Sequence, residues 1–356
     1  MKEIDVLIVG QGLAGTWLSW WLEQAGLSYL VLDHEDPSSA SRHAAGLINP
    51  VTGRRLVKTW MIDELMPFSW KAYQDMGVFF QKNFISRTKI VDFFPTVQML
   101  QAFQKRYAED SAYLEKESGN SGGAQEYKIR FRFDLGWGAI HPCYLVQTEE
   151  LLKCWQGHLL ENNYLRTESF DIGTLAYHES FIEYEDIRAR YIIFCDGKNT
   201  AGNPYFEKLP FALNKGEGLL VEINDIPGQT VFKKGMSLVP WKENTFWVGS
   251  SYQWEYADEE PSADFRSAAE NWLKNFLRTP FRIVDHFSAL RPATLERRPF
   301  VGFHPKYPRA GILNGLGTKG CSLAPYFAAQ LAGKITNNGI IDPLADIRRF
   351  ERILMK

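Results

Sequence analysis

The first 33 residues constrain what this chain can fold into more strongly than any other segment. Residues 4–9 form a short apolar run rich in β-branched side chains, which predicts a buried strand. The letters GQGLAG follow at once and open a helical apolar pattern, after which residues 29–32 predict a second strand that ends at Asp33. This order of strand, glycine-rich turn, helix, strand and acid is typical of the first βαβ unit of a dinucleotide-binding domain.

The glycines and the acid of this unit each have a chemical role. Gly10 permits the tight turn, Gly12 lets the backbone approach a pyrophosphate, and Gly15 lets the helix pack closely on the strand. The helix start offers unpaired N–H groups to phosphate oxygens. Asp33 lies where a carboxylate can accept hydrogen bonds from an adenosine ribose, which argues against a 2′-phosphate and therefore against NADP. The fingerprint alone leaves FAD and NAD open.

Two further segments predict other parts of the same ligand site. Residues 38–50 read SSASRHAAGLINP, in which Gly46 allows close backbone approach and Ser41 and Arg42 can reach a phosphate. A flexible linker is the alternative, but residues 44–48 are too apolar to be a typical one. Residues 192–200 predict a strand and an Asp-Gly turn that can place backbone beside a ligand, although a plain core strand and turn would have the same pattern.

The C-terminal region repeats the pattern of an apolar strand, a glycine-rich loop and a helix. Residues 312–331 read ILNGLGTKGCSLAPYFAAQL, and such a loop lets backbone touch a planar ring while the helix start stabilises an anion. Lys319 can add positive charge there, or it can be a solvated loop lysine. Arg291 precedes Pro292 on a segment expected to turn inward, and arginine is the side chain suited to bidentate capture of a carboxylate.

Composition excludes several classes of protein. Lys and Arg total 40 against 42 for Asp and Glu, and this balance argues against a nucleic-acid partner. The four cysteines lie far apart without a Cys/His cluster, so no disulfide framework and no metal site are predicted, and a reducing cytoplasm fits. No apolar run reaches the length of a membrane span, and the first residues are typical of a strand rather than a signal peptide.

The middle of the chain predicts a second region of mixed structure. Short strands of an antiparallel sheet are predicted at residues 219–223, 235–240 and 245–250. Residues 128–135 predict a further strand, residues 144–160 predict a helix, and residues 117–124 predict an exposed loop. Aromatic residues make up 14% of the chain, and whether they serve the core or a pocket is left open for Trp241, Trp247, Tyr252 and Trp254.

Five stretches together resemble the D-amino-acid oxidase family of FAD-dependent oxidoreductases, which includes glycine oxidase, sarcosine oxidase and D-amino-acid dehydrogenases. The stretches are GQGLAG, AAGLINP, GAIHP, LRPATLERRPFVG and GLGTKGCSLAP. They span most of the chain in the family's order. The last two are most similar to the FAD domain of the bifunctional enzyme that modifies the tRNA wobble uridine, whose methyltransferase half has no counterpart in this sequence.

The resemblance implies an α/β fold in which a Rossmann-type FAD-binding domain is interleaved with an α+β substrate domain that contains a mixed or antiparallel sheet. The expected FAD-binding domain comprises residues 1–55, 139–205 and 285–356. The expected substrate domain comprises residues 56–138 and 206–284. The interleaving follows because the N-terminal unit, the strand at residue 192 and the C-terminal glycine loop must all meet at one cofactor.

The resemblance also implies a reaction and a set of site residues. An amine or amino acid would lose hydride from the carbon next to nitrogen to flavin N5, and oxygen or another acceptor would reoxidise noncovalently bound FAD. The catalytic residues that follow are Arg291, which matches the family's carboxylate-binding arginine, and Lys319. The expected cofactor-binding residues are Gly10, Gly12, Leu13, Ala14, Gly15, Asp33, Ser41, Arg42, Ala45, Gly46, Leu47, Cys195, Gly197, Gly315, Gly317, Thr318, Lys319 and Gly320.

Some features keep other functions open. Thr318 stands where the family's glycine oxidase has a second arginine, so a simple glycine-like substrate is in doubt. His43, His141 and Tyr252 can tune the substrate amine, although a structural role is favoured for each. The alternatives are a tRNA-modifying flavoenzyme that removes a carboxymethyl group from a wobble-uridine side chain, and a flavin-binding protein without turnover.

Overall fold

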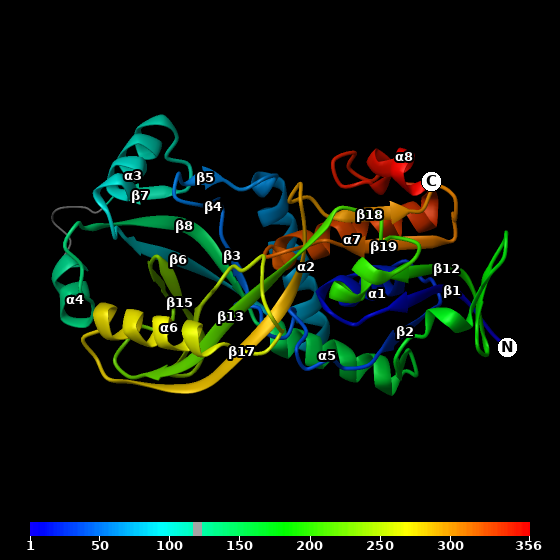
Figure 1. The fold of residues 1–356 in the computed structure, drawn as a ribbon, viewed down its shortest axis with the longest axis horizontal. Coiled ribbons are helices and arrows are strands. Elements are labelled where there is room, and N and C mark those ends of the chain that lie inside the picture. The colour runs from blue at the N-terminus through cyan, green and yellow to red at the C-terminus, as the bar shows by residue number, and fades with distance from the viewer. Residues whose placement is uncertain (117–122) are drawn as a thin grey trace.

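The computed structural model describes residues 1–116 and 123–356, so the loop predicted at residues 117–124 lies almost wholly outside the described residues. Two large sheets, each with its own helices, lie at opposite ends of the long axis of the molecule (Figure 1). One is built around parallel strands and the other is mixed and mainly antiparallel. This arrangement confirms the predicted α/β fold class.

The first sheet has a parallel centre formed by residues distant in sequence. β1 pairs in parallel with β2 and with β12, and β12 pairs in parallel with β19. Alternate side chains of β1 enter two separate apolar clusters, so the strand is buried on both faces. The strands of this sheet are β1 (Lys2–Val9), β2 (Tyr29–Asp33), β9 (Leu165–Thr167), β10 (Leu175–Tyr177), β11 (Ile182–Tyr184), β12 (Ile187–Phe194), β18 (Phe300–Phe303) and β19 (Ala310–Asn314).

Long helices cover one face of the first sheet. Aromatic side chains of the first helix join it to the others. Trp17 packs edge to face on Tyr73 with ring centres 4.9 Å apart, and the Trp21 indole N–H donates to Pro325 O at 2.9 Å. The prominent helices are α1 (Leu13–Gln24), α2 (Ile62–Phe80), α5 (Thr148–Glu161) and α7 (Gly320–Asn337). Shorter helical segments are η1 (Ile172–Thr174), η2 (Gly197–Gly202), η3 (Ile347–Phe350) and α8 (Glu351–Leu354).

The second sheet is antiparallel except where β14 runs parallel to β6. Its strands are β3 (Leu47–Ile48), β6 (Ile85–Phe93), β7 (Leu114–Lys116), β8 (Trp137–Val146), β13 (Phe211–Ile223), β14 (Val231–Lys234), β15 (Met236–Lys242), β16 (Thr245–Gly249) and β17 (Phe281–Thr294). The remaining elements are α3 (Val97–Glu109), α4 (Gly123–Arg130), α6 (Ala263–Phe276) and the hairpin of β4 (Val51–Thr52) and β5 (Val57–Lys58). The strands predicted at residues 219–223, 235–240 and 245–250 are confirmed by β13, β15 and β16.

One predicted element of the middle region is wrong, and a second is a helix as predicted with a different start. The predicted strand at residues 128–135 begins inside α4, and Phe131 forms only an isolated bridge to Leu277. The predicted helix at residues 144–160 starts later, because β8 continues to Val146 in register with β6 and α5 begins at Thr148. In the second place, pairing with the distant strand β6, which local sequence does not contain, decides the conformation.

The turn between β1 and α1 depends on the missing side chain of Gly15. A Cβ at this position would lie 1.9 Å from the backbone oxygen of Gly10, much closer than any carbon–oxygen contact allows. Gly10 has a φ of +98°, and a Cβ there would lie 2.7 Å from the oxygen of Cys195. Helix, turn and two strands therefore meet through backbone alone.

No helix among residues 1–116 and 123–356 is long and apolar enough to cross a membrane.

We expect Gly15→Ala to lower the free energy of unfolding of the ligand-free protein by about 1–3 kcal/mol, because the added methyl group overpacks the turn. Gly157→Ala is the matched control, since a Cβ on that helical glycine would lie in open space. The control should stabilise the protein by about 0.5–1 kcal/mol. Urea unfolding of both variants measures the difference. A Gly15→Ala protein with the same free energy of unfolding as the wild type would contradict the packing argument.

Candidate functional site

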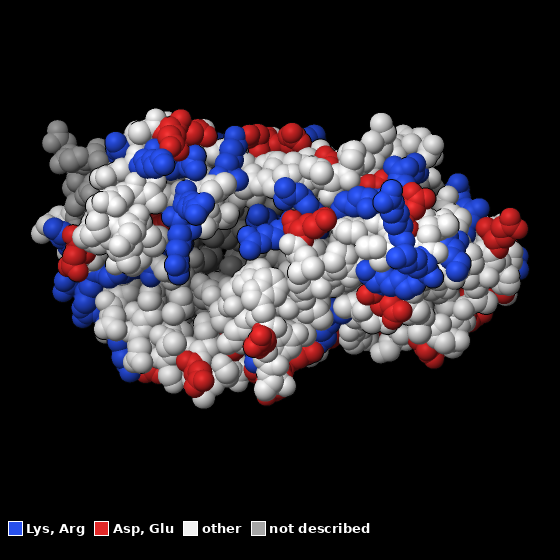
Figure 2. Space-filling view, turned by 45° about the horizontal axis from the view of Figure 1, so that its top comes forward, with Lys and Arg blue, Asp and Glu red and all other residues white. Residues whose placement is uncertain are grey.

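A cavity of about 760 Å³ lies between the two sheets, and residues from both line it. Its volume is in the range of cofactor and small-molecule sites. The carboxyl ends of β1, β2, β12 and β19 open on one side, where ligands of open α/β sheets bind. Figure 2 shows a hollow in the surface of the molecule with Lys and Arg side chains along its border. No group of three or more metal-ligating side chains occurs in the part of the chain that the structure describes.

The N-terminus of α1 lies at this cavity. Gly12 is the cap residue and has no side chain to bind the helix start, and the first turn contains no acidic residue. Leu13 N–H donates to Ser41 Oγ at 3.0 Å, which brings the segment after β2 against the turn. Gly12, Leu13 and Ala14 line the cavity, and Gly15 does not. A helix start with this polarity and no acidic neighbour is suited to a phosphate group.

Asp33 is held at the end of β2 by backbone groups. Its Oδ1 accepts a hydrogen bond from Gln11 N–H at 2.9 Å, and its Oδ2 accepts one from Glu35 N–H at 2.9 Å. Asp33 lines the cavity beside the glycine turn. Each carboxylate oxygen has a second lone pair, so the side chain keeps acceptor capacity for a ligand hydroxyl.

The segment from residue 38 to residue 48 is an ordered wall of the cavity. Gly46 has a φ of +73°, and its O accepts a hydrogen bond from Val146 N–H at 2.9 Å. Thr148 Oγ1 donates to Ala44 O at 3.1 Å, and a Cβ on Gly46 would lie 2.0 Å from Val146 O. These contacts fix the backbone between β2 and β4. The predicted residues that line the cavity here are Ser41, Arg42, Ala45, Gly46 and Leu47.

The turn after β12 brings an acidic group to the cavity. Cys195 N–H donates to Val9 O at 2.8 Å, and Gly197 adopts a φ of +61° with open space at its Cβ position. Cys195, Asp196 and Gly197 all line the cavity. Burial raises the pKa of Asp196 to about 6, even though the Thr200 hydroxyl donates to its carboxylate. The sequence predicts Cys195 and Gly197 as cofactor-binding residues, and Asp196 is a lining residue outside that predicted set.

The C-terminal glycine loop divides into residues at the cavity and residues that pack elsewhere. Gly317, Thr318 and Gly320 line the cavity. Gly315 does not, and a Cβ there would lie 2.6 Å from Thr294 Cγ2, so its role is close packing. Lys319 is also outside the lining, and burial together with Arg298 and Arg297 lowers its pKa.

One face of the second sheet forms the opposite wall. Phe287, Ala289 and Arg291 alternate along β17 and line the cavity. They pair across the strands with Gly218, Gly216 and Asn214 of β13. A Cβ on Gly216 would lie 1.9 Å from the Arg291 guanidinium, and one on Gly218 would lie 2.7 Å from Phe287 Cζ. These glycines make room for the cation at one end of the wall and for an aromatic ring at the other.

The aromatic end of the wall is built from three elements. Trp247 lies over Gly249, and a Cβ on that glycine would lie 2.8 Å from Trp247 Cη2. The indole N–H of Trp247 donates to His43 O at 3.1 Å. His43 stacks on Phe287 with ring centres 4.6 Å apart. Burial lowers the pKa of His43, and its Nε2 lies 2.9 Å from the Pro37 carbonyl, which only accepts hydrogen bonds. His43 therefore donates through Nε2 as a neutral ring.

The other candidates lie outside this wall. His141 is exposed on β8, with Nδ1 3.3 Å from a Glu115 carboxylate oxygen. Trp241 and Trp254 do not line the cavity. The glycines of β13 and β16 were missed by the sequence analysis, since inside short apolar strands they have no signature of a ligand site.

Arg291 is an inward-facing cation without a counter-ion. Its Nη1 donates to Asn214 Oδ1 at 2.9 Å and to Ser251 O at 3.2 Å, and its guanidinium carbon lies 5.8 Å from the centre of the Tyr252 ring. No carboxylate in residues 1–116 and 123–356 forms an ion pair with it. Burial lowers its pKa, yet a guanidinium stays charged at neutral pH. A half-buried, uncompensated cation at a cavity is suited to bind an anionic ligand group.

Comparisons with known proteins agree with this geometry. The family model described as DAO, FAD dependent oxidoreductase, matches residues 5–334. Glycine oxidase from Geobacillus kaustophilus is similar with a TM-score of 0.79 and 17% identity, over 98% of each chain. Iminodiacetate oxidase (IdaA) from Chelativorans sp. BNC1 has a TM-score of 0.75 and 16% identity, over 95% of this chain and 96% of that one. L-proline dehydrogenase from P. horikoshii has a TM-score of 0.73 and 14% identity, over 99% of this chain and 98% of that one.

The raised pKa of Asp196 predicts a pH dependence of stability. Between about pH 4 and pH 6 the carboxyl ionises in the unfolded chain but stays protonated in the folded one, so the free energy of unfolding falls as pH rises. This group contributes at most about 1.4 kcal/mol per pH unit over that interval, and nothing further above it. Asp196→Asn should remove this component. Urea unfolding of the ligand-free proteins at pH 4, 5, 6 and 7 measures it. If the free energy of unfolding changes with pH equally in the wild type and in Asp196→Asn, the prediction is wrong.

Proposed function

Because this chain belongs to the DAO family of FAD-dependent oxidoreductases, we propose that it oxidises the C–N bond of an amine or amino acid that carries a carboxylate. The observation that carries the proposal is that one cavity joins the glycine turn of α1 to Arg291, a cation that pairs with no carboxylate among the described residues. The first feature suits the dinucleotide part of FAD, and the second suits a carboxylate of the substrate.

The residues present fit FAD. The start of α1, at Gly12 to Ala14, would hold the pyrophosphate, and Asp33 would accept hydrogen bonds from the ribose. The backbone of residues 45–47 and 317–318 would border the planar ring. Gly10 supports this fit, because the close contact with Cys195 O leaves no room for a side chain in the turn. When bound, FAD supplies at flavin N5 the acceptor for a hydride from the carbon next to the substrate nitrogen.

We propose that the cofactor is held without a covalent bond. Cys321 lines the cavity at the start of α7, and burial raises the pKa of its thiol to about 12. A thiol with that pKa has almost no nucleophilic thiolate at neutral pH. The other lining cysteine, Cys195, also has its pKa raised by burial.

The protein would act on the substrate mainly by orientation. Arg291 would bind the carboxylate, and the Asn214 side chain and Ser251 carbonyl fix the direction of its guanidinium. The missing side chain of Gly216 leaves the space that the guanidinium occupies, while Trp247 and Phe287 supply apolar surface that excludes water. A neutral His43 adds no positive charge that would disfavour a cationic amine nearby. The substrate amine must react as the free base, and no acid–base side chain is required for that.

The oxidant of the reduced cofactor and the location of the protein are also part of the proposal. We keep oxygen or another acceptor as the oxidant of the reduced cofactor, and a cytoplasmic location as the setting. All four cysteines of the chain are free thiols, which supports a reducing compartment. The near balance of 40 basic and 42 acidic side chains argues against the alternative of a tRNA substrate. A flavin-binding protein without turnover is the other alternative that the test below separates.

The test of the function is anaerobic bleaching of the flavin. We expect purified protein to carry FAD and its absorbance to bleach when an amine with a carboxylate is added, whereas amines without a carboxylate should react at least about 100-fold more slowly. The panel would include a tRNA that bears a carboxymethylaminomethyl uridine. Protein that cannot be loaded with FAD would overturn the proposal. Flavin that is retained but never bleached would favour a protein without turnover.

Arg291→Ala should raise the KM for the carboxylate substrate by about 100-fold or more, because a buried charge-assisted contact is lost. Flavin content should not change, since Arg291 belongs to the second sheet. Arg282→Ala is the matched control, as this arginine lies on the same strand and is exposed. Steady-state kinetics on the substrate found by bleaching measure both variants, and an unchanged KM in Arg291→Ala would remove this residue from the site.

A further inference from the structure

The segment between β16 and α6 connects the cavity to the far face of the second sheet. Residues 250–261, which we call the strap, begin at Ser250 on the cavity. Directly after the strap, Ser262 caps α6 by accepting a hydrogen bond from Phe265 N–H at 3.2 Å. That helix packs on the face of the sheet away from the cavity, with its apolar side chains in a separate core.

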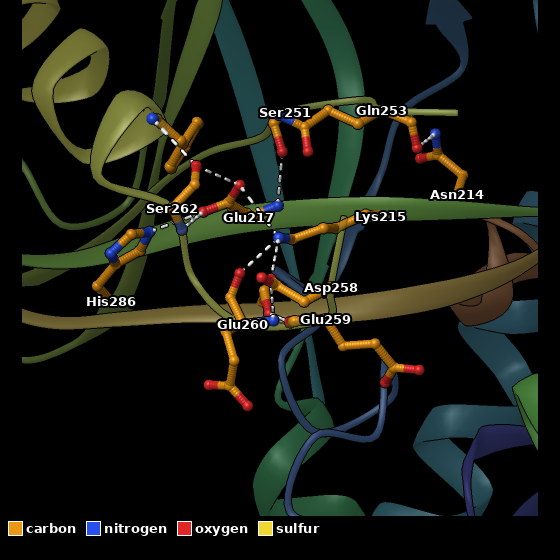
Figure 3. A network of polar contacts seen from close by, with 12 residues as sticks. Asn214, Lys215, Glu217, Ser251, Gln253, Asp258, Glu259, Glu260, Ser262 and His286 are labelled. Carbon is orange, nitrogen blue, oxygen red and sulfur yellow. Dashed lines mark hydrogen bonds and ion pairs between the residues drawn. The ribbon is translucent and has the colours of Figure 1, made fainter. Parts of the chain in front are cut away.

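The first residues of the strap run antiparallel beside β13, where Gln253 pairs with Lys215. Side chains alternate between the two faces of a strand. Asn214 and Gly216 face Arg291 on the cavity side of the sheet. Lys215 and Glu217 alternate with them, so both of their side chains point to the other face. Figure 3 shows Lys215 and Glu217 directed toward the end of the strap, at a distance from Asn214.

The start of the strap holds the guanidinium of Arg291. Ser251 O accepts a hydrogen bond from Arg291 Nη1 at 3.2 Å, and the Tyr252 ring centre lies 5.8 Å from the guanidinium carbon. The second acceptor of Arg291, Asn214, is itself tied to the strap, because its Nδ2 donates to Gln253 O at 2.8 Å. Both of these hydrogen bonds of Arg291 therefore depend on where residues 251–253 lie.

The end of the strap is held by two buried charges. Glu217 is fully buried, and it accepts hydrogen bonds from Ser262 N–H at 2.6 Å and from the Ser262 hydroxyl at 2.8 Å. His286 Nε2 lies 3.0 Å from the same carboxylate. Lys215, which is 3% exposed, donates to Glu260 O and lies 3.5 Å from an Asp258 oxygen. Figure 3 shows these groups as one connected network.

Glu217 contacts both ends of the strap. Its backbone N–H donates to Ser251 Oγ at 2.8 Å, and its backbone O accepts from Ser251 N–H at 3.2 Å. Its side chain binds Ser262, as described above. One residue of β13 thus fixes the place where the strap leaves the cavity and the place where it enters α6.

We propose that Glu217 is a positioning residue for the carboxylate site: its buried carboxylate fixes the strap, and the strap fixes Arg291. This inference rests on the proposed function, since it gives Arg291 the task of binding the substrate carboxylate. Glu217 does not touch the reacting atoms. Its effect passes through Ser262 and Ser251 to the acceptor that orients the guanidinium.

The negative charge of Glu217 is required for this role. A carboxylate accepts both Ser262 donors at once and faces Lys215 Nζ at 4.0 Å. A carboxamide has one acceptor oxygen, so in Glu217→Gln one Ser262 donor loses its partner. The buried Lys215 also loses its nearest buried counter-charge, which destabilises the network locally.

The experiment compares FAD-loaded wild type with Glu217→Gln by amide hydrogen exchange. We expect exchange at Ser251 and Gln253 to become at least tenfold faster, because their N–H groups bond to β13 only while the strap is fixed. Glu222→Gln is the matched control, with the same chemical change at an exposed position of the same strand. Unchanged exchange at Ser251 and Gln253 in Glu217→Gln overturns the proposal.

A kinetic measurement gives the second readout. With the substrate found by bleaching, Glu217→Gln should raise KM about tenfold and change kcat less than about twofold, since the carboxylate is held less well. A loss confined to kcat would overturn the proposal. Wild-type protein that oxidises no amine would overturn the proposed function instead, and the exchange measurement would still decide whether Glu217 fixes the strap.

Ser262→Ala covers the case in which Glu217→Gln does not fold. It removes one bond to the carboxylate and leaves the charge in place, so exchange at Ser251 and Gln253 should rise about threefold. Thr96→Ala controls for the loss of a helix cap, because Thr96 caps α3 in the same way. Equal exchange in Ser262→Ala and Thr96→Ala would overturn the proposal.

Discussion

The antiparallel pairing of β13 with β17 is the interaction on which the site depends. The two strands pair from Phe211 and Thr294 at one end to Ile223 and Phe281 at the other. At the first end Phe211 packs edge to face on Phe300, a residue of the first sheet, with ring centres 4.9 Å apart. The pair therefore joins the two sheets and also carries Arg291. A shift of one residue in its register would turn every cavity-facing side chain to the other face.

Alternation along these strands separates two groups of buried charge. Arg291 lies on the cavity face and has no acidic partner among residues 1–116 and 123–356, whereas Lys215 and Glu217 lie on the opposite face and neutralise each other within a hydrogen-bonded network. A buried charge is costly unless it is paired or binds a ligand. The difference between the faces is therefore chemical: one keeps a charge available for a ligand, and the other uses its charges to hold the strap in place.

Local sequence was sufficient for the end of the cavity at the turn between β1 and α1. The turn at Gly10, the start of α1 and Asp33 lie within one βαβ unit, where spacing along the chain fixes spacing in three dimensions. The start predicted for the helix at residues 144–160 was wrong because the pairing of β8 with the distant β6 outweighed the local pattern, and the strand predicted at residues 128–135 was wrong because α4 extends to Arg130. Local pattern was also insufficient for the wall of the cavity formed by the second sheet. Its glycines have a function only beside the side chains that they face.

The sequence by itself determined the family, the α/β class and the residues that form the turn at the cavity, because each depends on short-range order along the chain. Tertiary structure alone decided which face of β17 meets the cavity, that Gly315 and Lys319 lie outside the lining, and that Glu217 contacts both ends of the strap. The physical reason is that these relations arise from pairing and packing between segments far apart in sequence, and no local pattern encodes which segments meet.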